Sequence, residues 1–331
     1  MTPLRYCASL ITLVLLAACN DSSSSSGRGV ATHPASFSQH HFAQAGLPAR
    51  DYFVYIPASL PANAPLVVYL HGYERAEAVR AAGADLSWAR WEALDRLAAR
   101  EGFLVAYPTA RLGRWSLFPG LADASLEDGT PLDDVGFIRT MVEGLVAEGL
   151  ADPQRIYLTG FSDGAIMSYK LLCLPDLPFA AAAPGGGTMY QAHRDACTDA
   201  APPPLLAIAG TDDRILPYDG WLFPSGRELS IPETLEHFRL RHGCSGQRSS
   251  LRPDLVEDDG SRVREVRWTG CDPPGSVVLL RVEGAGHTWP GPEPVSPDWR
   301  YRAGGHNQDI DAAEEIWTFF GEWRKGDAGA E

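Results

Sequence analysis

A pentapeptide at residues 160–164 carries the strongest chemical signal in this sequence. It reads Gly-Phe-Ser-Asp-Gly and fits the pattern G-x-S-x-G, with Ser162 at its centre. Residues 155–159 before it are strand-like, and residues 165–172 after it follow a helical pattern. A serine on such a turn stands above the sheet, at a helix N-terminus that favours a developing negative charge. We therefore expect Ser162 to be a nucleophile.

A serine hydroxyl is a weak nucleophile unless a nearby base accepts its proton. Histidines that follow it along the chain are His193, His237, His242, His287 and His306. His287 lies in a glycine-rich loop after the strand-like residues 277–282, and loops that leave strand ends are where an α/β sheet places its ligands. We expect His287 to be the base, with His306 as the alternative.

Two adjacent carboxylates compete for the role of the acid that orients this histidine. Asp212 and Asp213 follow the strand-like residues 205–209, so both leave the carboxyl end of a strand. The acid in such a site fixes the tautomer of the histidine and stabilises its cation. The alternation of a strand does not extend into a loop, so the pattern alone leaves both residues open.

Two backbone N–H groups are expected to bind the negative oxygen of the reaction intermediate. One belongs to the residue after the nucleophile, Asp163, and the other to a loop after an early strand. Residues 66–70 form such a strand, and Tyr73 in the loop that follows is the expected second donor. His71, next to it, is expected to have a structural role.

Short apolar runs alternate with helical patterns along the rest of the chain. The expected strands are 52–56, 66–70, 103–107, 156–159, 179–183, 205–209 and 277–282, and several of them are almost continuously apolar. Helical patterns lie between them, at Trp88 to Leu97, Ile138 to Leu145 and 232–242, and a capping box of Asp311 with Glu314 precedes another. This alternation predicts an α/β fold with a mostly parallel sheet that is covered on both faces.

Residues 244–275 depart from this alternation because they are rich in charge. Asp259-Gly260 lies between two β-like runs in this segment, which favours a hairpin. Residues 257–260 are acidic and resemble a calcium loop, but the ligand spacing of an EF-hand is absent, so a turn is the better interpretation.

The amino-acid composition argues against two classes of protein. The chain has 331 residues, a formal net charge of −14 and 45% hydrophobic residues. An acidic balance disfavours nucleic-acid binding, which needs clustered positive charge. Past the first twenty residues no run of 18 apolar residues occurs, so a polytopic membrane protein is excluded.

The N-terminus is typical of an exported lipoprotein. Arg5 precedes a mostly apolar run over residues 8–18, which suits a signal peptide, and Leu-Ala-Ala-Cys at residues 16–19 matches a lipoprotein cleavage box. We expect residues 1–18 to be removed, Cys19 to be lipidated, and residues 19–44, which are rich in serine at first, to form a flexible tether. The catalytic domain then covers 45–325 and a tail covers 326–331. Plain secretion after cleavage behind Ala18 is the alternative.

Four cysteines remain outside the signal and the lipidation site. They are Cys173, Cys197, Cys244 and Cys271. Four exported cysteines suggest two disulfides with three possible connectivities, of which sequential pairing closes the shortest loops. Four free thiols are the alternative. No C-x-x-C pair occurs, so nothing supports a zinc ribbon, and no metal or cofactor is expected.

Several motifs together resemble those of the α/β-hydrolase esterases that include polyhydroxybutyrate depolymerases and feruloyl esterases. They are residues 70–72, 133–138, 155–164, 210–213 with 217–218, and 286–291. The resemblance covers about residues 45–325. It implies an α/β-hydrolase fold, Asp213 rather than Asp212 as the acid, and the pairs Cys244–Cys271 and Cys173–Cys197. The family usually has Asn or Gly around the serine turn, where this chain has Asp163.

The resemblance implies a serine carboxylic-ester hydrolase of the depolymerase type, with a feruloyl or acetyl-xylan esterase as the alternative. An acyl transferase or a peptidase would use the same three residues. A ligand-binding surface lipoprotein with a relic hydrolase fold is the alternative from another class. The candidates for an aromatic substrate pocket are Trp115, Tyr218, Trp221 and Trp289. The expected partners are an ester substrate and, through the lipid anchor alone, a membrane.

Overall fold

A ten-stranded mixed sheet runs through the chain, in the strand order β12-β13-β14-β9-β8-β7-β5-β6-β3-β2. The structure is a computed structural model that describes residues 31–326 except 33, 44–48, 83–86, 118–131, 199–200, 224–225 and 294. The strands are β2 (Ser36–Phe42), β3 (Arg50–Ile56), β5 (Ala64–Leu70), β6 (Leu104–Pro108), β7 (Ala151–Phe161), β8 (Ala181–Gly185), β9 (Leu205–Gly210), β12 (Gly246–Leu251), β13 (Arg262–Thr269) and β14 (Val277–Glu283). Cys19, the signal and most of the tether lie outside the described residues, as does nearly all of the tail.

Strands β6, β5, β7, β8, β9 and β14 pair in parallel, and antiparallel strands extend the sheet at both edges. Two small sheets pair β1 (Ala31–Thr32) with β4 (Ser59–Leu60) and β10 (Trp221–Phe223) with β11 (Gly226–Glu228). The expected mostly parallel sheet is therefore confirmed. The expected strand 179–183 begins two residues later, as β8.

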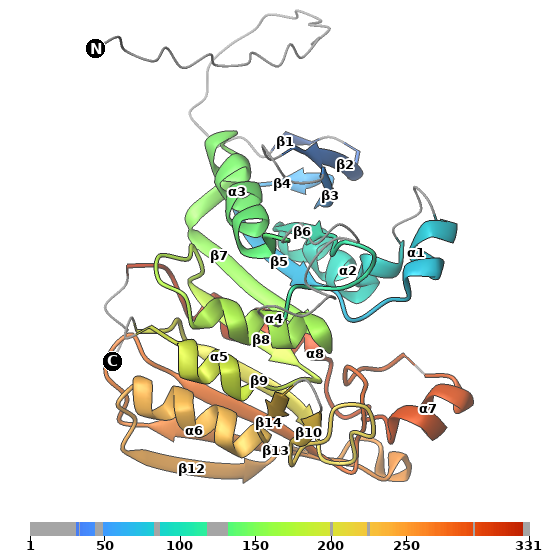
Figure 1. Cartoon of the computed structure of the whole chain (residues 1–331), viewed down its shortest axis with the longest axis vertical. Helices are drawn as coiled ribbons and strands as arrows, with labels where there is room; N and C mark the ends of the chain where they lie inside the picture. The colour runs from blue at the N-terminus through green and yellow to red at the C-terminus, as the bar shows by residue number, and fades with distance from the viewer. Residues whose placement is uncertain are drawn as a thin grey trace, which may run out of the picture.

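Helices cover both faces of the sheet (Figure 1). They are α1 (Ala76–Ala82), α2 (Glu92–Glu101), α3 (Asp134–Ala147), α4 (Asp163–Leu172), α5 (Gln191–Ala196), α6 (Ile231–Arg241), α7 (Pro297–Ala303) and α8 (Ala312–Gly321), with 3-10 turns at Ser87–Ala89 and Glu257–Asp259. The alternating side chains of strand β5 point to the two helical layers on opposite faces of the sheet. Leu66, Val68 and Leu70 pack with α3, α4 and α6, while Val67 and Tyr69 pack with α2 and α8. No helix among the described residues is long and apolar enough to cross a membrane.

The structure corrects three details of the sequence analysis. Residues 36–42, assigned to the tether, form β2 and pair with β3, so the folded part begins earlier than expected. Trp88 and Trp91 precede α2 and do not lie on it. Asp311 caps α8 through the backbone N–H of Ala313, and no capping box forms because Glu314 binds Arg100.

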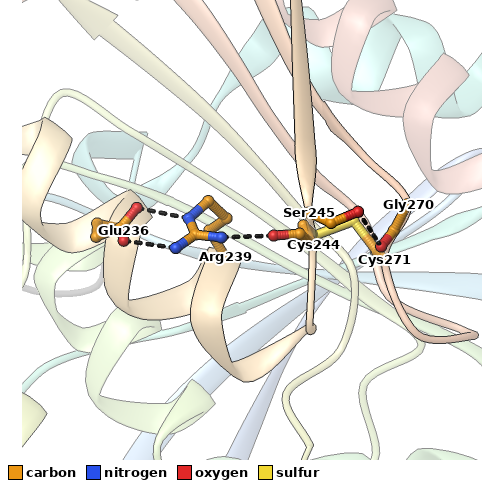
Figure 2. The surroundings of a disulfide bond; sticks show 6 residues. All are labelled: Glu236, Arg239, Cys244, Ser245, Gly270 and Cys271. Atoms are coloured by element: carbon orange, nitrogen blue, oxygen red, sulfur yellow. Dashed lines mark hydrogen bonds and ion pairs between the residues drawn. A yellow bond between two sulfur atoms is a disulfide. The ribbon is translucent and has the colours of Figure 1, made fainter.

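Both disulfides have the sequential pairing, Cys173–Cys197 and Cys244–Cys271. The second one closes the open end of the predicted hairpin, which β12 and β13 form. Figure 2 shows how α6 approaches this bridge: Arg239 donates to the Cys244 carbonyl oxygen, and Glu236 holds its guanidinium at 2.6 and 2.7 Å. The charged segment is thereby tied to the helix that covers the sheet.

Candidate active site

Ser162 lies on a tight turn between β7 and α4. Its backbone is in a strained conformation, with φ 57° and ψ −123°, which a residue with a side chain rarely adopts. Close contacts explain both glycines of the motif. A Cβ atom on Gly160 would lie 2.6 Å from the carbonyl oxygen of Gly164, and one on Gly164 would lie 2.0 Å from that of Leu70. Glycine at these two positions therefore lets the turn pass close to the end of β5.

His287 and Asp213 meet at the carboxyl edge of the sheet. Their loops follow β14 and β9, two neighbouring parallel strands. The His287 Nδ1 atom lies 2.7 Å from Asp213 Oδ2, and the two side chains are 4% and 3% exposed. Asp213 Oδ1 accepts from the backbone N–H groups of Ile215 and Leu216 at 2.9 and 2.8 Å. These bonds hold the carboxylate in place and leave Oδ2 for the histidine.

The alternative acid, Asp212, and the alternative base, His306, have other partners. Asp212 turns outward and pairs with Arg214 at 3.1 Å. The Nε2 atom of His306 donates to the carbonyl oxygens of Gly291 and Glu293, at 3.1 and 2.9 Å. His306 thus secures the loop that carries His287 and does not contact the acid itself.

The loop after β5 runs directly against the serine. A Cβ atom on Gly72 would lie 3.1 Å from Ser162 Cβ and 3.7 Å from Ser162 Oγ. Among the described residues, the backbone N–H groups of Tyr73 and Asp163 donate no hydrogen bond. Two amide donors beside a serine hydroxyl are what a developing oxyanion requires.

His71 holds this loop in place. Its Nε2 atom accepts from the backbone N–H of Ala110 at 2.9 Å, so the proton of the neutral ring is on Nδ1, which donates to the Gly72 carbonyl oxygen at 2.6 Å. Burial lowers the pKa of His71 to about 4, so the ring stays neutral. Because the C=O and N–H of one trans peptide point in opposite directions, fixing the Gly72 carbonyl also fixes the Tyr73 N–H.

A buried ion pair supports the same region. Asp134, the first residue of α3, accepts from Arg50 at 2.6 Å with one oxygen and from the backbone N–H of Ser116 at 2.6 Å with the other. Arg50 also donates to the Thr109 carbonyl oxygen at 2.9 Å. The pair therefore ties β3, α3 and the loop after β6 together behind His71.

Two of the four pocket candidates, Trp115 and Tyr218, pack against the protein itself. Trp115 is buried under the β5 loop and donates to the His71 carbonyl oxygen at 2.8 Å, so it supports that loop and is not open to substrate. Tyr218 packs against the core, with the Arg281 guanidinium 5.5 Å from its ring.

Trp289 and Trp221 remain accessible. Trp289 lines a cleft of about 300 Å³ that His287 and Phe161 also line. Its ring stacks on Trp91 at 4.7 Å between centroids. Trp221 lies on β10 and is 53% exposed.

Two acidic side chains, Asp163 and Glu228, have raised pKa values, and no pattern in the sequence indicated that they interact. Burial raises the pKa of Asp163 to about 6, against the smaller opposing effects of Arg114 and His287. Burial also raises the pKa of Glu228 to about 7, and Asp163 and Asp213 add to this increase. No sequence motif marks Glu228, because only tertiary pairing brings β11 to this place.

One group of side chains among the described residues has the spacing of a metal site, namely Cys173, Cys197 and His237. The two cysteines are joined in a disulfide, so they offer no thiolate to a metal ion. This donor set does not fit a metal.

No protein-family model matches the chain. Several curated proteins are nevertheless similar to it in sequence. The NocK protein of Nocardia uniformis subsp. tsuyamanensis, described as an esterase, is 29% identical over 70% of this chain and 67% of its own length. Feruloyl esterase B of Piromyces equi is 27% identical over 62% of this chain and 37% of its own length. Poly(3-hydroxyalkanoate) depolymerase C of Paucimonas lemoignei is 37% identical over 42% of this chain and 31% of its own length. In sequence this chain is therefore similar to esterases of the feruloyl esterase, acetylxylan esterase and poly(3-hydroxyalkanoate) depolymerase groups.

The match spans only about a third of the length of two of these three relatives. Among solved structures, the acetyl xylan esterase of Aspergillus awamori superimposes with a TM-score of 0.51 at 16% identity, over 79% of this chain and 96% of the other. At that identity the likeness concerns the fold, and it agrees with the predicted α/β-hydrolase architecture.

Proposed function

We propose that this protein is a serine carboxylic-ester hydrolase. Ser162 attacks the ester carbonyl, and His287 accepts its proton and later donates it to the leaving alcohol. Asp213 keeps the proton of the neutral ring on Nδ1 and stabilises the histidine cation. The observation that carries the proposal is the buried pair of His287 and Asp213, 2.7 Å apart, at the same sheet edge as the strained serine turn.

The backbone N–H groups of Tyr73 and Asp163 bind the oxyanion in this mechanism. The supporting observation is the short approach of Gly72 to the serine side chain. Losing one such donor typically raises the barrier by about 3 kcal/mol. Each step uses the chain's own residues, so the mechanism requires no metal or cofactor.

The proposed substrates are hydroxyalkanoate oligomers, in the manner of a depolymerase. The 37% identity with poly(3-hydroxyalkanoate) depolymerase C over 147 residues favours them. Feruloylated or acetylated plant polysaccharide is the second candidate, because other matched relatives are feruloyl esterases and a bifunctional acetylxylan esterase/xylanase.

A fluorophosphonate probe tests the nucleophile, because it reacts with an activated serine and not with an ordinary one. We expect mass spectrometry to find the adduct on Ser162, no labelling of Ser162→Ala, and full labelling of Ser250→Ala, whose serine is exposed on β12. A wild-type protein that is folded and does not react would favour the non-catalytic lipoprotein instead.

We also propose that the chain is exported and anchored by a lipid on Cys19. Two disulfides support export, because they persist in oxidising compartments. We expect the mature protein in the membrane fraction and Cys19→Ser in the soluble exported fraction. Full-length protein in the cytosol would contradict export.

A further inference from the structure

A cleft of about 300 Å³ lies beside His287, between the start of α2, the loop that follows this histidine and α7. Its apolar walls are mainly aromatic and include Trp91, Ala93, Phe161, Trp289 and Trp299. This volume is at the lower end of the range for small-molecule pockets, so the cleft suits a single ring. The proposed mechanism leaves the cleft without a role.

Trp289 is the centre of the aromatic wall and is held on several sides. Its ring stacks on Trp91 with the centroids 4.7 Å apart, and it packs against Phe161 at 5.0 Å. A Cβ atom on Gly185, the last residue of β8, would lie 2.2 Å from Trp289 Cζ3, so the ring rests directly on the end of this strand. A wall that is already ordered loses little freedom when a ligand packs on it.

The ionisable side chains that line the cleft, apart from His287, already have partners in the protein. Arg96 and Glu293 form an ion pair with each other. His306 donates to two backbone carbonyl oxygens of the same loop. Asp311 caps the positive N-terminal end of α8. The cleft therefore offers a ligand aromatic surface, and it suits an apolar group.

The cleft lies on the histidine side of Ser162. Strand β7, which leads to the serine, stands between β5 and β8 in the sheet. The loop after β5, with the Tyr73 N–H, comes from one side, whereas β8, β9 and β14, which leads to His287, lie on the other. Phe161 directly precedes the serine and packs against both His287, at 4.8 Å between centroids, and Trp289. The cleft thus adjoins the ring that moves the proton.

Proton transfer decides which half of the ester lies next to this cleft. When the tetrahedral intermediate collapses, the bond between the carbonyl carbon and the alcohol oxygen breaks, and the His287 cation donates its proton to that oxygen. The donor must be within hydrogen-bond reach of the oxygen that leaves, so the alcohol group stands beside His287. The oxyanion faces the N–H groups of Tyr73 and Asp163 instead.

We propose that this cleft binds the alcohol half of the ester and makes the enzyme favour aromatic alcohols. The inference rests on the proposed function and adds the nature of the group that leaves. Aromatic rings that pack edge to face or offset attract each other beyond the burial of their area. A polar alcohol of the same size would lose hydrogen bonds with water that these walls do not replace.

Two isomeric esters test which half the cleft binds. Benzyl acetate carries a phenyl ring on its alcohol, whereas methyl phenylacetate carries the same ring on its acyl group. We measure kcat/KM for both with the wild-type protein and divide each value by the rate constant for alkaline hydrolysis of that ester, which removes differences in intrinsic reactivity. We expect a preference of about tenfold or more for benzyl acetate.

A third ester separates an aromatic group from a merely apolar one. Cyclohexylmethyl acetate has a ring of similar size without aromatic character. We expect its corrected kcat/KM to be lower than that of benzyl acetate by about two- to tenfold. Equal values would overturn the preference for aromatic alcohols.

The variant Ala93→Phe fills the cleft from α2, a helix that carries none of the proposed catalytic residues. We expect the preference for benzyl acetate over methyl phenylacetate to fall by about tenfold, because the larger side chain occupies the space of the alcohol. Ala99→Phe, on the exposed side of the same helix, is the matched control and should keep the wild-type preference.

A wild-type enzyme without a preference, or with a preference for methyl phenylacetate, would overturn the inference even if Ala93→Phe failed to fold. An equal loss on both esters in a folded Ala93→Phe protein would overturn it too. Failure of the proposed function would look different: none of the esters would be cleaved, and the fluorophosphonate probe would not label Ser162.

Discussion

Two adjacent aspartates have opposite surroundings in this site. Asp213 turns inward to His287 and receives two backbone N–H groups, whereas Asp212 turns outward to Arg214. The sequence alone could not separate them, because the direction of a loop side chain depends on the backbone around it. Resemblance to related esterases indicated Asp213, and the geometry places the same residue beside the histidine.

Replacing each aspartate separately tests this assignment. Asp213→Asn keeps the shape but favours the wrong tautomer of His287, so we expect kcat to fall by about 10³–10⁴-fold. Asp212→Asn, the matched control, should stay within about threefold of wild type. The measurement is kcat on 4-nitrophenyl butyrate. The assignment is wrong if Asp212→Asn is the variant that loses activity.

The aromatic side chains show what residue type cannot predict. Trp115 looked like a pocket residue, but its indole N–H is bound to the His71 carbonyl oxygen beneath the loop. Trp289 and Trp221 remain accessible. A tryptophan suits a core and a binding site equally well, so burial decides between them and only the fold reveals it.

At the scale of elements, the parallel strands were predictable and the edge strand β2 was not. The central strands are apolar along most of their length because both faces are buried, as β5 shows with seven buried residues. β2 reads Ser-Phe-Ser-Gln-His-His-Phe and is half exposed, so its polar residues resembled a tether. The hairpin of β10 and β11 is short, and tertiary pairing with Tyr190 supports it.

The start of α3 offers a matched pair of substitutions. Asp134→Ala leaves Arg50 buried without its partner, so we expect the free energy of unfolding to fall by about 3–5 kcal/mol. Asp133→Ala removes an exposed N-cap bond to the Gly136 N–H and should cost about 1 kcal/mol. Urea unfolding measures both. Equal losses would mean that the buried pair does not tie these elements together.

At the scale of the whole molecule, the disulfides close loops of 24 and 27 residues. In the chain-entropy model each contributes about 3.5 kcal/mol to the free energy of unfolding. We expect Cys244→Ser/Cys271→Ser to lower that free energy in urea by about this amount. An unchanged urea midpoint with an unchanged slope would contradict this expectation.

The order of the three proposed catalytic residues along the chain indicates how the whole sheet is built. Ser162, Asp213 and His287 follow three strands that are parallel to one another, so their loops must emerge at the same edge of the sheet. This topology was predictable from alternating strands and helices. The pairing of distant segments around Glu228 was not, because it depends on the contact between the short β10–β11 hairpin and Tyr190.

The most direct test of the central claim is ester hydrolysis by the purified mature protein. We would measure kcat/KM on a 3-hydroxybutyrate oligomer and on methyl ferulate, with Ser162→Ala beside the wild type. We predict hydrolysis of at least one ester by the wild type and a loss of about 10⁶-fold in kcat, in practice complete, for the variant. A folded Ser162→Ala protein that cleaved these esters as fast as wild type would contradict the account.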